Sequence, residues 1–328
     1  MIGSANAIAR WIETHDEIAV ITHIRPDGDA LGTALALVNA IGALGKRAFA
    51  VCEDPAEKKY LFLPGVQSLY DLDGMPYAPK AVLTCDVADR GRMGKLEQVF
   101  DSVPECDRAV VDHHHTNPGF APVSWVDGDS ASCGEMALEL MDELGVKLSP
   151  QTALCLFTAI STDCGNFSFG NTTSWSYRYA ARCVEAGVDV EDITRKLYRT
   201  RSLQKTRLIG LALSKLETYF SGKVAVISIS NDMFREAGAD HTDTNSIVNY
   251  LNEIEGVKIG FVCEQTEDGN NVKFSFRAAG GADVSALAAE FGGGGHVAAA
   301  GATVRDTTLD EIVPKVVKAA GKYVQEMT

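Results

Sequence analysis

Two groups of acids and histidines are the residues of this sequence best suited to chemistry. Each group follows a short apolar run, 18–21 or 109–111, that is typical of a buried strand. The members are His23, Asp27 and Asp29 in the first group, and Asp112, His113, His114 and His115 in the second. Asp86 and Asp163 also follow apolar stretches, so we expect acids and imidazoles to converge from four distant points. This mixture of oxygen and nitrogen ligands predicts a site for one or two divalent ions.

The first group on its own has a simpler interpretation. Asp27 and Asp29 precede an expected helix over 30–44, so either carboxylate could serve only to cap that helix, with His23 as a turn residue. Consecutive imidazoles beside Asp112 at a strand end are hard to explain by packing or capping, because histidine is the commonest metal ligand near neutral pH. The two groups together therefore favour a metal site. A pair of ions about 3.5–4 Å apart is a recurrent device for hydrolysing phosphoesters.

Three neighbouring motifs are better explained without chemistry. Asp27 and Asp29 resemble the start of an EF-hand loop, but Val38 stands where the bidentate glutamate is needed. The glycines 292–295 are followed by histidine and valine, so they are no phosphate-binding Walker loop. Ser132, with a glutamate three residues later, is typical of a capped helix start and not of a nucleophile.

The composition excludes several function classes. The 328 residues carry a net charge of -14, which argues against a main role in gripping long duplex nucleic acid. No apolar run approaches the roughly 20 residues of a membrane helix, and residues 1–16 lack the pattern of a signal peptide. The eight cysteines are scattered without a CxxC pair, which favours free thiols in a reducing cytoplasm. We therefore expect a cytoplasmic protein with no membrane partner.

The order of apolar runs predicts the fold class and the domains. Strand candidates at 18–22, 48–52, 81–85 and 109–111 alternate with helical patterns, which indicates an α/β fold with a parallel sheet. We place this first domain at 1–187. Helical patterns at 188–221 indicate connecting helices, with their basic residues on a solvated face. A second, smaller α/β domain is expected at 222–328, with strands near 224–229, 259–262, 272–277 and 300–304 and helices near 284–290 and 309–325.

Five segments of the chain resemble the DHH phosphoesterase family and its associated C-terminal substrate-binding domain. They are THIRPDGDALG at 22–32, TCDVADR at 84–90, DHHHTN at 112–117, TAISTDCGNF at 158–167 and GGGGHVAAAG at 292–301. Together they extend over almost the whole chain in the family's order. One departure is Cys164, where relatives often carry threonine, which affects the local hydrogen bonding and not the adjacent ligand.

The resemblance implies a dinuclear manganese site, with Mg²⁺ or Co²⁺ as alternatives. The implied ligands are His23 and Asp27 for one ion, Asp29, His113 and Asp163 for the other, and Asp86 as the bridge between them. Asp112 would orient the histidines. His114 would lie near the scissile phosphate as a hydrogen-bond donor or proton-transfer group. His115 occupies a variable position of the motif.

In the second domain, the glycines and two basic residues are candidates for binding substrate. A run of Gly293, Gly294 and Gly295 permits close backbone approach to an anion, and His296 can donate to a phosphate or stack on a base. Arg277 offers a planar fork suited to phosphate. The resemblance implies that His296 and Arg277 bind the far end of the substrate. The alternatives are a flexible turn for the glycines and an exposed strand position for the arginine.

The resemblance implies metal-dependent hydrolysis of short oligoribonucleotides and dinucleotides to mononucleotides, and of adenosine 3',5'-bisphosphate to AMP. The partners would be these small nucleotides, and the resemblance implies a homodimer. A single-strand DNA exonuclease of the same family would need a larger and more basic chain. A family II pyrophosphatase would carry basic residues in place of the glycine-histidine segment. A phosphodiesterase of linear or cyclic dinucleotides and a nucleotide sensor without turnover are the remaining alternatives.

Overall fold

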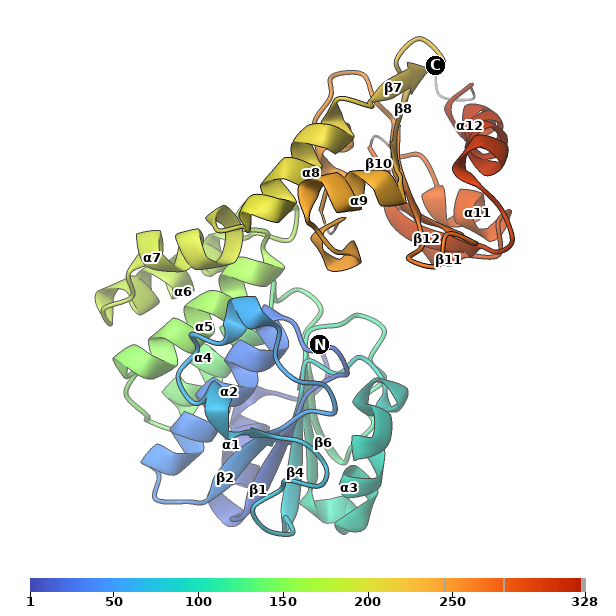
Figure 1. Cartoon of the computed structure of the whole chain (residues 1–328). Helices are drawn as coiled ribbons and strands as arrows, with labels where there is room; N and C mark the ends of the chain where they lie inside the picture. Colours follow the sequence, from blue (N-terminus) through green and yellow to red (C-terminus); the bar gives the residue numbers. More distant parts are fainter. Residues whose placement is uncertain (245, 280, 326–328) are drawn as a thin grey trace. The chain divides into compact units, whose positions relative to one another are not determined.

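The computed structural model describes residues 1–244, 246–279 and 281–325, and the chain divides into two compact units, Met1–Thr200 and Arg201–Thr328 (Figure 1). Each unit contains its own six-stranded sheet with helices, which confirms the predicted α/β class. The domain limits expected near 187 and 221 stay a prediction. No helix within the described ranges combines the length and the apolar character that a membrane span requires.

The sheet of the first unit is parallel throughout, in the order β3-β2-β1-β4-β5-β6. The strands are β1 Ile18–Ile21, β2 Ala48–Val51, β3 Leu69–Tyr70, β4 Ala81–Cys85, β5 Arg108–Asp112 and β6 Val123–Val126. The chain proceeds outward from β1 in both directions, so the strand order reverses between β1 and β4. In open parallel sheets, ligands bind beyond the carboxyl ends of the strands at such a switch point. The segments after β1 and β4 are those that contain His23 and Asp86.

Helices cover both faces of this sheet, as Figure 1 shows. One face carries α1 Ala5–Thr14, α2 Gly28–Ala43, α4 Cys133–Glu143 and α5 Pro150–Asp163, and the other carries α3 Glu97–Ser102 with the 3₁₀ segment η3 Arg90–Leu96. Short 3₁₀ turns lie at η1 Lys58–Tyr60, η2 Val66–Ser68 and η4 Glu105–Asp107. The unit closes with α6 Ser174–Glu185, α7 Val190–Thr194 and the π-helical turn η5 Arg195–Arg199.

Close packing of α2 against α5 brings the start of one helix to the end of the other. A β-carbon added at Gly28 would collide with the side chain of Thr162, and one added at Gly32 would collide with the carbonyl oxygen of Cys155. The absence of side chains at these two positions therefore lets the helices approach closely. As a result Asp163, the last residue of α5, lies at the amino-terminal turn of α2.

We expect Gly32→Ala to lower the free energy of unfolding by about 1–3 kcal/mol, because its methyl group would have to displace the backbone of α5. Gly42→Ala is the matched control, since it lies in the same helix and a β-carbon there meets nothing within 4 Å. This control should be neutral or slightly stabilising. Chemical denaturation of both variants measures the difference, and equal stabilities would refute the packing argument.

The sheet of the second unit is mixed, in the order β11-β12-β10-β9-β8-β7, with β8 and β9 parallel and the other pairs antiparallel. Its strands are β7 Glu217–Tyr219, β8 Val224–Ile229, β9 Ile259–Gln265, β10 Val272–Ala278, β11 Gly294–His296 and β12 Ala299–Val304. The helices are α8 Leu203–Leu213, α9 Asn231–Ala237, α10 Asn249–Asn252, α11 Val284–Ala289 and α12 Leu309–Gln325, with a 3₁₀ turn η6 at His241–Thr244. One face of the sheet packs on α11 and α12, whereas α8, α9 and α10 pack on the other face over β8 and β9.

Candidate active site

The acids and histidines singled out in the sequence gather at the carboxyl edge of the parallel sheet. His23 follows β1, Asp86 follows β4, and Asp112 ends β5 just before His113. Helices supply the remaining acids: Asp27 caps α2, Asp29 lies in its first turn, and Asp163 ends α5. The structure therefore brings together residues that are widely separated in the sequence, all in the first unit.

Asp86 lies at the centre of this cluster of acids and histidines. Its Oδ2 atom lies 3.4 Å from Nε2 of His23, and its Oδ1 atom lies 3.5 Å from Nε2 of His113. The residue is buried and has a φ of 58°, in the left-handed region that aspartate tolerates better than most residues. The two oxygens of one carboxylate thus face two different imidazoles.

Two ligand groups share this carboxylate. In the first, Nε2 of His23 is 3.8 Å from Oδ1 of Asp27. In the second, Nε2 of His113 is 3.7 Å from Oδ2 of Asp29 and 3.6 Å from Oδ2 of Asp163. The candidate ligand atoms of His23, Asp27 and Asp86 lie within 4.8 Å of one another, a compactness that suits coordination of a single ion.

Both imidazoles are oriented by main-chain carbonyls. Nδ1 of His23 lies 2.8 Å from the carbonyl oxygen of Ile24, and Nδ1 of His113 lies 3.3 Å from that of Ser130. Because a carbonyl can only accept, each Nδ1 carries a hydrogen and each Nε2 faces the carboxylates. Metal-binding histidines are commonly held in this way. Sequence reasoning missed these partners, since a main-chain carbonyl has no sequence signal.

The charges of the cluster shift several pKa values. Burial lowers the pKa of His23 and His113, but their carboxylate partners outweigh it and raise each to about 10. Burial raises the pKa of Asp163 to about 6, and burial with the nearby Asp86 and Asp163 raises that of Asp29 well above its usual range. Burial would also raise the pKa of Asp86, but the two imidazoles lower it. The positive charge of the protonated imidazoles balances the negative charge of these carboxylates. A divalent cation bound by the same side chains would balance that charge in their place.

Asp29 is supported by the amino terminus of α4. Its Oδ2 accepts a hydrogen bond from the backbone N–H of Cys133 at 2.7 Å, and its Oδ1 accepts one from that of Gly134 at 2.9 Å. Thr33 Oγ1 donates a third at 3.0 Å. The positive end of the helix dipole stabilises a carboxylate at this position. Sequence reasoning did not identify this support.

Asp27 has the capping role that the simpler interpretation assigned to it, and it also faces His23. Its Oδ1 accepts hydrogen bonds from the backbone N–H groups of Asp29 and Ala30, while its side chain remains 54% exposed. The two roles are therefore compatible.

At α4, Ser132 accepts from Glu135 N as the sequence predicted, but the Glu135 carboxylate accepts from Ala131 N. That reciprocal bond thus reaches one residue beyond the helix cap.

Asp112 orients one of the two neighbouring histidines. Its Oδ1 lies 2.8 Å from Nδ1 of His114, and its Oδ2 accepts a hydrogen bond from Asn117 at 2.7 Å. Asp112 is fully buried, whereas 42% of the His114 side chain is exposed. The contact with Asp112 raises the pKa of His114, which favours an imidazolium that can donate. His115 instead packs close to Gly128.

In the second unit, Arg277 and His296 lie in one row across the sheet. Arg277 of β10 pairs with Ala299 of β12, and Ala299 also pairs with His296 of β11. Directly paired residues project from the same face, so the two side chains flank Ala299 at about 10 Å, two strand spacings. Burial lowers the pKa of Arg277, and its Nη1 donates a hydrogen bond to the carbonyl oxygen of Phe276 at 2.9 Å. This places two donors on one face with a small residue between them.

The glycines preceding His296 have different structural roles. A β-carbon at Gly293 would collide with the carbonyl oxygen of Gly301, and one at Gly295 would lie 2.6 Å from that of Ala299. These two glycines allow β11, an edge strand the sequence did not predict, to pair with β12. Gly294 has open space around its β-carbon position. Close approach of a ligand is therefore easiest at Gly294.

Two domain families match the chain: the DHH family, N-terminal domain, matches residues 17–160, and the DHHA1 domain matches residues 221–326. Over 305 residues the chain is 35% identical to the bifunctional oligoribonuclease and PAP phosphatase NrnA of Thermus thermophilus, covering 92% of this chain and 88% of that protein. The chain belongs to the DHH family. It is also 28% identical to NrnA of Bacillus subtilis, covering 90% of this chain and 92% of that protein.

The fold of this DHH protein has a solved counterpart. An exopolyphosphatase-related protein from Bacteroides fragilis superposes with a TM-score of 0.84 at 23% identity, covering 98% of this chain and 95% of that one. Membership of the DHH family, together with the clusters of acids and histidines, makes this chain a metal-dependent phosphoesterase.

We expect Asp112→Asn to lower kcat/KM about 10- to 100-fold, because the amide orients His114 less well and no longer stabilises its protonated form. In the pH–rate profile, a pKa assigned to His114 should fall in this variant, since the carboxylate that raises it is gone. The matched control is Asp129→Asn, an exposed acid of the same unit. A lower rate with no change of the profile would contradict the orienting role.

Proposed function

We propose that this DHH phosphoesterase uses two Mn²⁺ ions to hydrolyse short oligoribonucleotides to mononucleotides and adenosine 3',5'-bisphosphate to AMP. The substrate class is supported by the extended similarity to proteins named oligoribonuclease and PAP phosphatase. The proposal includes a homodimer, a cytoplasmic location and no binding of long duplex nucleic acid.

The observation that carries the proposal is that the two oxygens of Asp86 face two separate ligand groups. His23 and Asp27 with one oxygen of Asp86 would hold one ion. Asp29, His113 and Asp163 with the other oxygen would hold the second. Two divalent ions at such a site activate water and neutralise the charge that develops on a phosphoryl group.

The side chains around these groups have separate tasks in this scheme. Asp112 holds the ring of His114 by its Nδ1 atom, which leaves the partly exposed imidazole available to donate to a phosphate oxygen. Arg277 and His296 would bind the substrate's distal phosphate or base, since a guanidinium offers paired donors and an imidazole can donate or stack.

A substrate panel tests the proposal. End-labelled RNAs of two to five and of about twenty nucleotides, adenosine 3',5'-bisphosphate, pyrophosphate, and linear and cyclic dinucleotides are each incubated with Mn²⁺. We expect the dinucleotides and the bisphosphate to be hydrolysed fastest, and a chelator to stop the reaction. The chain is also 24% identical to cyclic-di-AMP phosphodiesterase PdeA of Listeria monocytogenes, covering 97% of this chain but 49% of that protein. Preferred hydrolysis of cyclic dinucleotides or of long RNA would overturn the proposed substrate class.

The affinity of the metal-free protein for Mn²⁺ should rise with pH between about 6 and 9. His23 and His113 have pKa values of about 10 without a cation, so each must lose a proton before Nε2 can bind an ion. Raising the pH removes this competition, and the gain should level off above about 10. Calorimetric titration in buffers of different ionisation enthalpy measures both affinity and proton release. A pH-independent affinity, or no released protons, would contradict the assignment of these two ligands.

A further inference from the structure

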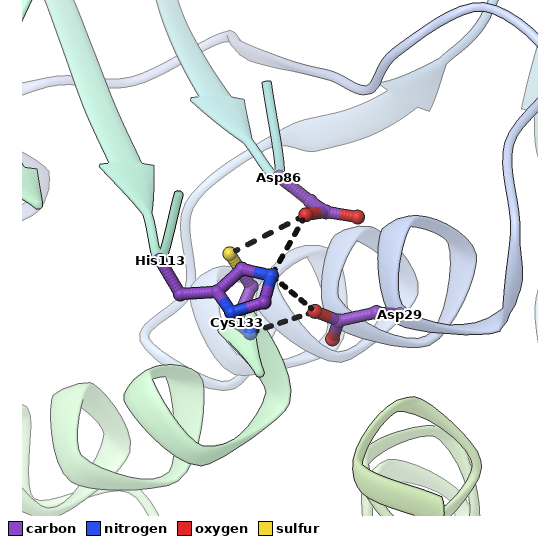
Figure 2. A group of neighbouring side chains, drawn as sticks. All are labelled: Asp29, Asp86, His113 and Cys133. Atoms are coloured by element: carbon purple, nitrogen blue, oxygen red, sulfur yellow. Dashed lines mark hydrogen bonds and ion pairs between the residues drawn. The ribbon is translucent and has the colours of Figure 1, made fainter. Parts of the chain in front are cut away.

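The side chain of Cys133 lies beside the second ligand group. Its sulfur is 4.0 Å from Oδ1 of Asp86, and candidate ligand atoms of Asp29, Asp86, His113 and Cys133 all lie within 4.8 Å of one another. Figure 2 shows the thiol beside the imidazole of His113, with the two carboxylates around them. The residue is fully buried at the first position of α4, so its position is fixed by the helix start.

The spacing of these atoms fits one ion with a sulfur ligand. In a tetrahedral site, a sulfur ligand lies about 2.3 Å from the ion and an oxygen ligand about 2.1 Å from it. Two such ligand atoms are therefore about 3.6 Å apart. The observed separation of 4.0 Å between the Cys133 sulfur and Asp86 Oδ1 therefore requires a shift of only a few tenths of an ångström. Oxygen and nitrogen ligands serve Mn²⁺ well, whereas thiolate sulfur favours softer ions such as Zn²⁺.

We propose that Cys133 makes the second ion position an inhibitory site for Zn²⁺, with its sulfur taking the place of Asp163 as the fourth protein ligand beside Asp29, Asp86 and His113. The inference rests on the proposed metal centre. A thiophilic ion binds the sulfur as thiolate, and the thiol proton passes to solvent. Four protein ligands complete the tetrahedral shell of a zinc ion, whereas Mn²⁺ prefers six ligands and with four protein ligands keeps positions open for water. Zn²⁺ at this position should therefore stop turnover that Mn²⁺ supports.

The competing explanation is that the Cys133 side chain only fills space in the core and donates weak S–H hydrogen bonds. Its sulfur also lies 3.8 Å from the carbonyl oxygen of Val111 and 4.0 Å from Oδ1 of Asp112. Under this explanation serine at 133 would leave the response to all divalent ions unchanged, because serine keeps a small donor and the backbone N–H that supports Asp29.

Cobalt spectroscopy separates the two explanations without measuring activity. All proteins carry Cys106→Ser, because Cys106 is the exposed cysteine of the chain and would bind metal on its own. The chelated protein is titrated with Co²⁺, whose visible absorption reports binding and whose near-ultraviolet sulfur-to-cobalt charge transfer reports a thiolate ligand. We expect charge transfer in this background and in the control Cys155→Ser, whose buried sulfur lies near Pro64 O instead. Cys133→Ser should bind Co²⁺ without that band.

Zinc inhibition provides the second readout. Each variant's Mn²⁺-supported dinucleotide hydrolysis is normalised to its own rate and titrated with Zn²⁺. Cys133→Ser should raise the half-inhibiting Zn²⁺ concentration by at least about tenfold, as expected for loss of one ligand. Two results would overturn this inference and leave the proposed metal centre standing. One is cobalt binding without charge transfer in the background protein, and the other is unchanged zinc inhibition in Cys133→Ser. Absence of any cobalt binding overturns the proposed metal centre and this inference with it.

Discussion

Asp86→Ala is expected to lower kcat/KM for a dinucleotide by at least about 1000-fold, which corresponds to about 4 kcal/mol of lost transition-state stabilisation. The reason is that one carboxylate faces both ligand groups, so its removal affects both ions at once. No other described acid has its two oxygens paired with two of these imidazoles in this way. Steady-state rates with excess Mn²⁺ and the metal content of the purified protein measure the effect.

Two further variants make this result interpretable. Asp86→Asn keeps a residue type that tolerates the left-handed backbone at this position. A loss of activity in this variant is therefore due to the lost carboxylate charge and not to backbone strain. Asp73→Asn removes an exposed acid of the same unit and should leave the rate unchanged. If Asp86→Asn stayed folded and kept more than a few per cent of the wild-type rate, the bridging role of Asp86 would be wrong.

The double variant Arg277→Ala/His296→Ala should lower kcat/KM about 1000-fold on dinucleotides and on adenosine 3',5'-bisphosphate. Each single change should cost about 10- to 100-fold, the usual range for a charged hydrogen bond to a phosphate. Both the apparent affinity and the maximal rate should fall, because distant contacts also position the reacting phosphate. The metal content should stay unchanged, since the ligand groups lie in the first unit.

A small activated phosphodiester without a distal nucleotide is the comparison substrate for these variants. Its hydrolysis should change much less than that of the dinucleotide. Arg305→Ala, which removes an exposed positive charge from the same unit, is the control for a general electrostatic effect. Equal losses on the nucleotide and on the small ester would exclude a role in substrate recognition, and would place Arg277 and His296 in the fold or the chemical step.

The strand ends were predictable because hydrophobic runs and the polar residues after them are both visible in the sequence. The run at 81–85 is a strand with the expected limits, the strand expected at 18–22 ends one residue earlier at Ile21, and the acids and histidines after both meet at one sheet edge. Short edge strands such as β3 and β11 lack such a run, and their pairing depends on neighbours distant in the chain. The same holds for the row of Arg277 and His296, which arises from strand register.

Contacts made by main-chain atoms were not predictable, because any residue type supplies them. The carbonyl of Ser130 orients His113, and the N–H groups at the start of α4 support Asp29. Neither contact depends on the identity of the donor or acceptor residue. Their positions follow only from how α4 is seated against the sheet.

The support of Asp29 by backbone N–H groups has a consequence for mutational scanning of this protein. Alanine at position 133 would retain the backbone donor to Asp29, so a side-chain scan would miss this contribution to the site. A β-carbon at Gly134 would lie 2.6 Å from that of Ala159, so a change there would report helix packing and not the hydrogen bond. Replacing the backbone amide at position 133 by an ester would remove the donor without changing the side chain. Such a backbone substitution is therefore the change that measures this contribution to the site.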